Sequence, residues 1–290
     1  MQILANGLFS GAQFACLALA FYLINKAQQF LDFSLAATVT VSAYVASAIA
    51  RCFDVPFFVV VVLGALCGGI VGVLFDLCAF RPLRKNEASS LVKLLASCGL
   101  MIAGINAVSM ICGDSPQLFL ETVEIRSVFV LASRLTWIQI GTFFVAFFVF
   151  GGCWILLQWT KWGISLRALA SDTQLAGCVG INTTLSISIA VGIASCIAGL
   201  VATLSGMDTG IAPSIGFKLL FPSVVAYVVG GMGRLSGAFL GGFAVGIIQQ
   251  YAGWYFGAAW QDAVLFFLLC LFLFLKPQGL FTTPLSHADV

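Results

Sequence analysis

The chain has 290 residues and a formal net charge of +2, and 61% of its residues are hydrophobic while only 8% are charged. An average soluble domain carries about 25% charged residues, so a water-soluble globule of this composition would expose large apolar patches and aggregate. The composition therefore excludes a soluble domain and predicts a protein whose apolar surface is covered by lipid.

The sequence offers few residues for nucleic-acid binding or for a metal or thiol redox site. No basic cluster is long enough to follow a phosphate backbone, which argues against nucleic acid as a partner. Ten cysteines occur without any C-x-x-C pair, and the single histidine, His287, lies near the C-terminus. Zinc and thiol redox sites need clustered soft ligands. We therefore expect no metal site and no cofactor in this chain, and cysteines that act as small apolar residues.

Nine apolar runs are candidates for membrane spans, since about 20 apolar residues cross ~30 Å of hydrocarbon. The run at 217–230 is short and flanked by prolines and glycines, which is typical of a broken or re-entrant helix. We predict an all-α polytopic transmembrane helical bundle of 8–10 spans, with residues 1–290 forming a single transmembrane domain. The nine runs are 3–25, 36–52, 55–80, 94–113, 137–158, 184–207, 217–230, 238–257 and 262–276.

The second run is unusually polar. Polar groups in hydrocarbon need either a neighbouring helix or a water-filled route. We therefore name the polar residues at and before its start as candidates for lining a solute pathway: Asp32, Ser34, Thr38, Thr40 and Ser42.

The Lys/Arg bias of short loops predicts the orientation. If the loop at 81–85 is cytoplasmic, nine alternating spans place nine basic residues inside and four outside. The N-terminus is then outside and the C-terminus inside. The segment 114–136, which follows the fourth run, becomes an extracytoplasmic excursion. Its alternating β-branched and aromatic residues fit a hairpin, and a plain connecting loop fits them equally well.

Glycines recur at four-residue spacing, as in Gly64/Gly68/Gly72 and Gly242/Gly246. On a helix such residues share one face and allow backbones to approach closely. The spacing predicts tight helix packing, and the sequence does not distinguish static packing from faces that slide during a conformational cycle.

The loop at 159–182 falls on the predicted cytoplasmic side. Ser165 suits a helix N-cap, and residues 166–178 are rich in Ala and Leu, which favour helix. Gly180 suits a left-handed C-cap, and Asn182 can cap the next span. We predict one short amphipathic helix here. It either lies on the lipid surface or docks into a protein groove, and its small, weakly charged character favours docking slightly.

Catalytic groups are scarce inside the predicted spans. Asp76, Asp208 and Asp262 lie near span ends, and the sequence shows no evident partner for any of them. Ion-coupled carriers usually contain buried carboxylates or histidines. The scarcity of catalytic groups predicts that the chain is not an enzyme. The scarcity of buried carboxylates and histidines favours a transporter driven from outside its own membrane domain.

The cytoplasmic loop contains the motif G-x-S-x-R-A-x-A-x-D-x-x-x-A-x-x-x-G-I-N, from Gly163 to Asn182. Three further segments accompany it: Phe80-Arg81-Pro82-Leu83-Arg84, the glycine-rich stretch from Gly230 to Gly242, and Lys276-Pro277-Gln278-Gly279-Leu280-Phe281. In these four motifs, and in their order, the sequence resembles a known family, the inner-membrane permease subunits of branched-chain amino-acid ABC importers. The N-terminal part departs from the family, which typically has Asn-Phe-Ala-His-Gly-Glu where this chain has residues 32–37.

The resemblance implies a function and a set of partners. The chain would be a multi-pass permease of the bacterial inner (plasma) membrane that moves a small polar solute, most often a branched-chain or other amino acid, by alternating access. A second permease subunit, two cytoplasmic ATP-binding subunits and an extracytoplasmic solute-binding protein would complete the transporter, and ATP would be used only in the partner subunits. The coupling-helix residues that would dock on the ATPase are Ser165, Arg167, Ala168, Ser171, Asp172, Ala176 and Gly180.

Two alternatives remain from the residues themselves. An ion-coupled carrier, or a passive channel for a solute such as urea or an amide, also fits an apolar bundle; the scarcity of buried ionisable residues argues only against the coupled version. A membrane enzyme acting on lipid would need a polar catalytic cluster at the membrane surface, and the sequence contains none.

Overall fold

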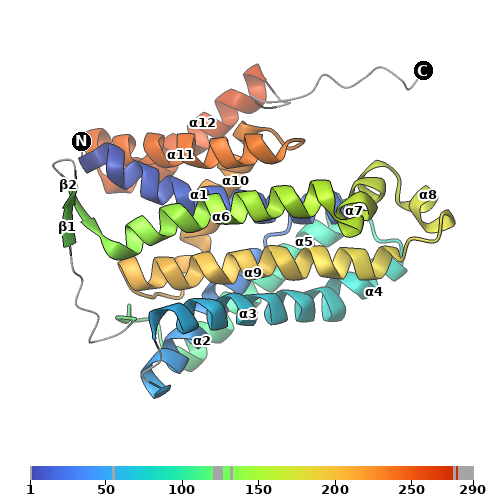
Figure 1. Cartoon of the computed structure of the whole chain (residues 1–290), viewed down its shortest axis with the longest axis horizontal. Coiled ribbons are helices and arrows are strands. Elements are labelled where there is room, and N and C mark those ends of the chain that lie inside the picture. Colours follow the sequence, from blue (N-terminus) through green and yellow to red (C-terminus); the bar gives the residue numbers. More distant parts are fainter. Residues whose placement is uncertain (1, 54–55, 120–126, 131–132, 277–278, 280–290) are drawn as a thin grey trace.

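The computed structural model describes residues 2–53, 56–119, 127–130, 133–276 and 279. It is a bundle of long, mostly parallel or antiparallel helices with a small hairpin at one end (Figure 1). The first half contains α1 (Gln2–Gln28), α2 (Leu35–Phe53), α3 (Phe57–Phe75), the π-helical turn η1 (Asp76–Phe80), α4 (Arg81–Lys85) and α5 (Ser90–Cys112). The second half contains β1 (Ser127–Val130), β2 (Ser133–Thr136), α6 (Trp137–Trp159), α7 (Lys161–Ser171), α8 (Thr173–Cys178), α9 (Thr183–Thr209), α10 (Ile215–Gly230), α11 (Leu235–Phe256), the 3-10 turn η2 (Ala258–Trp260) and α12 (Gln261–Leu275).

The nine predicted runs correspond to nine helices, α1, α2, α3, α5, α6, α9, α10, α11 and α12. Within the described part of the chain, seven of these are long and apolar enough to cross a membrane. The helix α10 is too short, with 16 residues. The helix α11 has 22 residues, and its five glycines and two adjacent glutamines lower its hydropathy. The prediction of an α-helical membrane bundle is confirmed.

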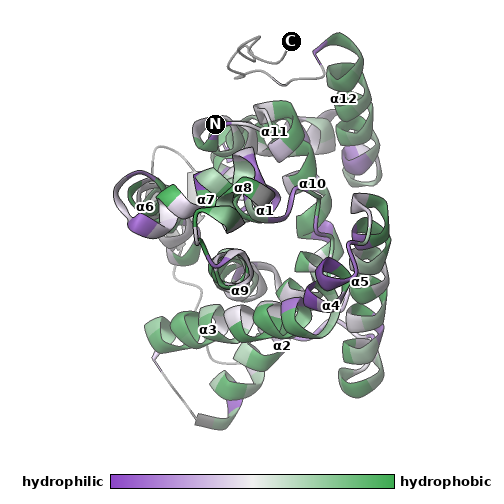
Figure 2. Ribbon diagram, turned by 90° about the vertical axis from the view of Figure 1, so that its right-hand side faces the viewer, coloured by the Kyte–Doolittle hydropathy of each residue, from purple (hydrophilic) through white to green (hydrophobic). Residues whose placement is uncertain are grey.

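The centre and one side of the bundle differ in burial; Figure 2 shows α1 inside the bundle and α5 and α12 together at one edge. The helix α1 runs through the centre and is buried along most of its length, against α11, α9, α10 and α6. In contrast, only 6% of the residues in the most apolar 18-residue stretch of α5, and of η2 with α12, are buried. Their outward side chains are large and hydrophobic, for example Met110 and Phe274, which are 88% and 89% exposed. Such a surface requires lipid or another protein chain to cover it.

Glycines allow the two closest helix pairs to form. Between α3 and α9, a Cβ atom on Gly68 would lie 2.4 Å from the Ser195 carbonyl oxygen and 2.8 Å from the Gly199 Cα. Between α1 and α11, a Cβ on Gly242 would lie 2.3 Å from the Ala15 Cα, and one on Gly246 would lie 2.3 Å from the Gly11 Cα. Real Cβ atoms do not approach other atoms this closely, so the four-residue glycine spacing produces backbone-to-backbone packing.

The excursion predicted at 114–136 contains a short antiparallel hairpin, in which Ser127 of β1 pairs with Thr136 of β2. Residues 120–126 and 131–132 lie outside the described residues. Residue 117 forms an isolated bridge with Ile211, which ties this segment to the connection between α9 and α10. The hairpin lies at the opposite end of the bundle from α7 and α8 (Figure 1).

Candidate functional site

The loop at 159–182 folds differently from the single helix predicted at 166–178. It forms two helices, α7 and α8, separated at Asp172, whose backbone is extended with φ −155° and ψ 115°. The N-cap of α7 is Thr160, whose hydroxyl accepts from the Gly163 N–H at 3.1 Å. The prediction that Ser165 caps the helix was therefore wrong. Ser165 lies inside α7, where its hydroxyl donates to the Lys161 carbonyl at 3.1 Å.

Gly163 explains why the helix starts earlier than the sequence indicated. A Cβ at this position would lie 2.4 Å from the carbonyl oxygens of both Leu156 and Leu157 at the end of α6. A glycine lets α7 begin directly against α6, and Leu166 and Leu169 then point into the bundle, where they are 1% and 0% exposed. The helix α7 is thus anchored on the bundle by one face.

Asp172 starts the second helix. Its carboxylate accepts from the Leu175 N–H at 3.1 Å, the contact expected of a helix N-cap. At the other end, Gly180 has φ +89° and the Ile181 N–H donates to the Ala176 carbonyl at 3.1 Å, which is a Schellman motif. Asn182 caps α9 by accepting from the Leu185 N–H at 3.1 Å. The geometry predicted for Gly180 and Asn182 is therefore present.

The predicted docking residues differ in exposure, and some face away from the bundle while others face into it. Arg167, Ser171, Asp172 and Gly180 are exposed, Ser165 and Ala168 are half-buried, and Ala176 is buried. Apolar side chains on the same loop are also exposed, among them Ile164 at 58%, Leu175 at 64% and Val179 at 82%. This end of the bundle therefore presents a mixed apolar and polar surface.

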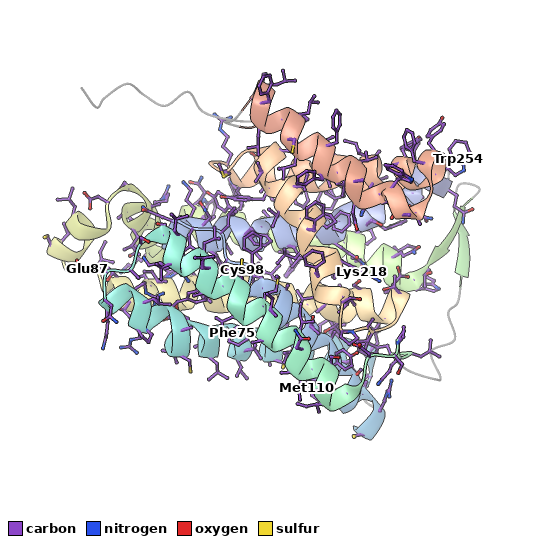
Figure 3. The ribbon with its side chains drawn as sticks, turned by 180° about the vertical axis from the view of Figure 1, so that it is seen from behind. Phe75, Glu87, Cys98, Met110, Lys218 and Trp254 are labelled. Carbon is purple, nitrogen blue, oxygen red and sulfur yellow. The ribbon has the colours of Figure 1, made fainter. Side chains whose placement is uncertain are left out.

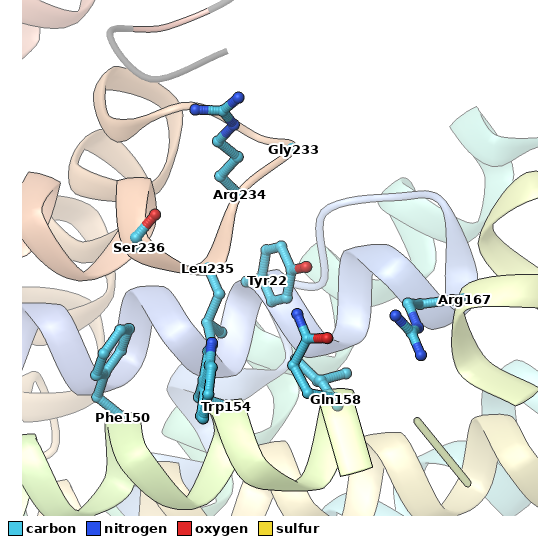
Figure 4. A pocket seen from close by; sticks show the side chains of 10 residues that line it. Tyr22, Phe150, Trp154, Gln158, Arg167, Gly233, Arg234, Leu235 and Ser236 are labelled. Atoms are coloured by element: carbon cyan, nitrogen blue, oxygen red, sulfur yellow. The ribbon is translucent and has the colours of Figure 1, made fainter. Parts of the chain in front are cut away.

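Arg167 also borders a cavity of about 300 Å³ formed by α1, α6, α7 and the start of α11. Figure 4 shows Arg167 and Arg234 on different sides of Tyr22 and Gln158. The two arginines come from two of the motifs singled out in the sequence, and only the tertiary structure shows that they border one cavity.

The loop is connected to the break between α1 and α2. The Gln29 side-chain amide donates to the Ala170 carbonyl of α7 at 3.4 Å. On the other side of the break, the Phe33 N–H donates to the Ser97 hydroxyl of α5 at 3.2 Å, and the Phe30 ring lies 5.4 Å from the Phe80 ring of η1. Residues 29–34 thus contact three elements at the same end of the bundle.

The candidate pathway residues lie in and just after this break, and all five are at most 3% exposed. The Asp32 carboxylate accepts from the Ser34 N–H at 2.9 Å, and burial raises the pKa of this carboxyl to about 6. The hydroxyls of Thr38 and Ser42 donate to the backbone carbonyls of Ser34 and Thr38, four residues earlier in each case. Thr40 also reaches the Pro213 carbonyl at 3.3 Å, just before α10. None of these residues lines the cavity beside Arg167 or the cavity beside Lys218, so their role in the pathway stays a prediction.

Asp76 has partners that the sequence did not reveal. It is fully buried in η1, and its two carboxylate oxygens accept from the Arg84 guanidinium at 2.6 and 3.1 Å. The Ser188 hydroxyl of α9 donates to the same carboxylate at 2.6 Å. The sequence offered one signal for the ion pair, the closeness of Asp76 to the Arg-Pro-Leu-Arg segment, while Ser188 is far away in the chain.

A second cavity of about 450 Å³ lies toward the hairpin end, between α1, α9 and α10. Its lining combines apolar side chains with hydroxyls, an amide and one cation, Lys218, which lies on α10 (Figure 3). Sequence reasoning missed this site because its residues come from three distant segments. The one available signal was a lysine inside an otherwise apolar run. The lining residues are Ser10, Gln13, Phe14, Pro116, Ser205, Thr209, Gly210, Ile211, Ala212, Ile215, Lys218 and Leu219.

Comparison with known proteins identifies the family. Residues 3–273 match the model of the family described as branched-chain amino acid transport system / permease component. The chain belongs to this family. The permease is 28% identical, over 98% of its length and 96% of the relative's, to the high-affinity branched-chain amino acid transport system permease protein BraD of Pseudomonas aeruginosa. It is 26% identical to the LivH permease protein of Escherichia coli K12, over 98% and 96% of the two chains.

The fold of the permease agrees with a solved structure. The complex titled PsaBC from Streptococcus pneumoniae in complex with Fab contains a chain with a TM-score of 0.51 and 14% identity, covering 96% of the permease and 93% of that chain. At this identity the likeness concerns the fold alone. The predicted identity as an ABC importer permease of the inner membrane, drawn from four short motifs, is confirmed by the family match over nearly the whole chain.

Proposed function

We propose that this permease forms part of the transmembrane pathway of an ATP-driven importer for branched-chain or other amino acids. Its partners would be a second permease subunit, two cytoplasmic ATP-binding subunits and an extracytoplasmic solute-binding protein. The chain would have no catalytic site and hold no cofactor, and ATP would be hydrolysed in the partner subunits. The permease family and the named relatives support the amino-acid cargo.

The α7–α8 loop carries the argument for an ATPase partner. The exposed apolar side chains of Ile164, Leu175 and Val179 would be covered if the loop docked into a groove on another protein. The anchoring residues Leu166 and Leu169 are buried in the bundle, so a force applied to the loop would reach the transmembrane helices. The loop therefore has one surface for a partner and one for the bundle.

The Gln29–Ala170 hydrogen bond is the observation that best supports coupling between this loop and the pathway. It joins α7 to the break between α1 and α2, directly before Asp32. A displacement of α7 would therefore be transmitted to the segment that leads into the polar second helix. ATP would shift the equilibrium between two access states by its different affinity for each.

The test uses the transporter assembled with its ATP-binding subunits and binding protein in proteoliposomes. Val179→Asp places a charge on the exposed docking surface, and we expect at least about a tenfold loss of both ATPase co-purification and ATP-driven leucine uptake. Asn86→Asp, which adds the same charge to an exposed turn between α4 and α5, is the matched control. Uptake that follows an ion gradient and ignores ATP, or co-purification that survives Val179→Asp, would contradict the proposal.

A further inference from the structure

The lining of the cavity between α1, α9 and α10 includes a lysine, Lys218, whose side chain is exposed. Lys218 is the fourth residue of α10, and a cation is disfavoured near the N-terminus of a helix, where the helix dipole is itself positive. No acidic residue that the structure describes lines the cavity. Among the described residues, Lys218 forms no salt bridge. The Lys218 ammonium and the positive end of the α10 helix dipole therefore both favour an anion in the cavity.

Two polar side chains in the cavity have no hydrogen-bond partner in the described part of the chain. Ser205 lines the cavity although it is only 3% exposed, and Gln13 lines it from α1. Their neighbours are already engaged, because the Ser10 hydroxyl accepts from the Gln250 amide at 3.1 Å and the Thr209 hydroxyl donates to the Ser205 carbonyl at 3.0 Å. The Ser205 hydroxyl and the Gln13 amide line the cavity and can therefore hydrogen-bond a ligand inside it.

The remaining wall is apolar. Phe14, Ile215 and Leu219 line the cavity and are at most 7% exposed. The volume of about 450 Å³ lies in the usual range for small-molecule pockets, about 300–1,000 Å³. A ligand that matches the whole cavity carries a negative group, further hydrogen-bonding groups and an aliphatic part.

The depth of the cavity fits a solute in transit. Ser10 and Gln13 lie roughly two to three turns into α1, counted from its first residue at the hairpin end. The start of α10, which forms one wall, is held against α2 by the Thr40 hydroxyl on the Pro213 carbonyl. A ligand in the cavity would therefore touch α1, which leads to the break at residues 29–34, and α10, whose start is bonded to α2.

We propose that this cavity binds the transported amino acid and that the Lys218 ammonium holds its α-carboxylate. The Ser205 hydroxyl and the Gln13 amide hydrogen-bond the polar end of the amino acid. Phe14, Ile215 and Leu219 contact its aliphatic side chain. This inference rests on the proposed function, since it takes the ligand to be the solute that the importer carries.

Binding is measured without the solute-binding protein, so that the specificity of that protein does not enter. The permease, assembled with its ATP-binding subunits in lipid nanodiscs, is heated with millimolar L-leucine or with L-leucinol, which keeps the ammonium and the side chain but lacks the carboxylate. A ligand that binds the native state raises the unfolding temperature by mass action. We expect L-leucine to stabilise the wild type and L-leucinol to bind at least about tenfold more weakly, as loss of a charge-assisted contact implies.

Three variants test whether Lys218 is responsible for the preference for L-leucine over L-leucinol. Lys218→Met should bind L-leucine at least about tenfold more weakly than the wild type and lose the preference over L-leucinol, while Lys218→Arg should keep that preference because it keeps the charge. Lys85→Met removes an exposed lysine at the other end of the bundle and should bind as the wild type does. The proposal is overturned if L-leucine does not stabilise the wild type, or if Lys218→Met retains the preference for L-leucine.

ATP-driven leucine uptake by the complete transporter, measured in parallel, distinguishes failure of the Lys218 site from failure of the proposed transport function. If the wild type shows no ATP-driven uptake, the proposed function fails, whatever the binding data show. If uptake is ATP-driven and Lys218→Met still prefers L-leucine to L-leucinol, only the assignment of the carboxylate to Lys218 fails.

Discussion

The Arg84 guanidinium donates to both carboxylate oxygens of Asp76, eight residues earlier in the chain, and the carboxylate is fully buried. Asp76 is the first residue of the π-helical segment η1, which carries the chain from α3 into α4, where Arg84 lies. Because Ser188 of α9 donates to the same carboxylate, this ion pair joins the α3–α4 junction to the helix that follows the α7–α8 loop.

Removing Arg84 should destabilise the permease strongly. Arg84→Met leaves the Asp76 carboxylate buried with only the Ser188 hydroxyl, and an uncompensated buried charge typically costs about 3–5 kcal/mol. Arg81→Met, which removes an exposed arginine from the same short helix, is the control and should cost little. Thermal unfolding in detergent measures both. The double variant Arg84→Met/Asp76→Asn should be more stable than Arg84→Met alone, and a purely additive loss would contradict the ion-pair explanation.

Asp32 should make stability depend on pH. Burial raises its pKa from 3.8 to about 6, so the native state holds a proton that the unfolded state releases. The stabilisation from this group is full below about pH 4 and is lost as the pH rises through about 6, by at most about 3 kcal/mol. Asp32→Asn keeps an oxygen acceptor for the Ser34 N–H and should flatten this part of the pH profile. An unchanged difference between pH 5 and pH 7 in the variant would show that another group is responsible.

Two glycine-to-alanine variants should have opposite effects. Gly68→Ala would place a Cβ 2.4 Å from the Ser195 carbonyl oxygen, so α3 and α9 would have to separate, at a cost of about 1–3 kcal/mol. Gly152→Ala on α6 meets no atom within 4 Å and should gain up to about 1 kcal/mol from higher helix propensity. Denaturation midpoints in detergent compare them. Equal stability of the two variants would mean that the α3–α9 contact is not close-packed.

Gln29 and Glu87 form a matched pair for testing the link between α7 and the α1–α2 break. Both have a left-handed backbone, with φ of 59° and 50°, so a glycine at either position should relieve strain of about 1 kcal/mol. Only Gln29 contacts α7 through its side chain. We expect Gln29→Gly to reduce ATP-driven uptake severalfold without loss of stability, and Glu87→Gly to leave uptake unchanged. Equal uptake by both variants would remove the Gln29–Ala170 bond from the coupling route.

Asp172 should control the second helix of the loop. Asp172→Ala removes the acceptor for the Leu175 N–H and should weaken the first turn of α8 by about 1 kcal/mol, whereas Asp172→Asn can still cap it. Hydrogen exchange at residues 175–178 should be about fivefold faster in the alanine variant only. Equal exchange in the two variants would show that the cap does not hold α8.

Much of the bundle follows from local pattern. Each apolar run became a helix, because a backbone in lipid must satisfy its own hydrogen bonds. The caps at Gly180 and Asn182 are local as well, since the residues involved lie within five positions of each other. The predicted start of the helix at 166–178 was wrong, because it was chosen from the local sequence alone. Ser165 looks like a cap only if the close approach of Gly163 to the end of α6 is not known.

The sequence by itself determined that this is a helical membrane protein. Four ordered motifs also determined that it is a permease of this family. These properties depend on composition and on short segments. Only the tertiary structure decided which polar groups meet: Arg84 and Ser188 on Asp76, Gln29 on α7, and Lys218 beside Ser205 and Gln13 in one cavity. The physical reason is that helix packing brings together residues up to about two hundred positions apart, and the hydrophobic pattern that predicts each helix does not specify which helices pack against each other.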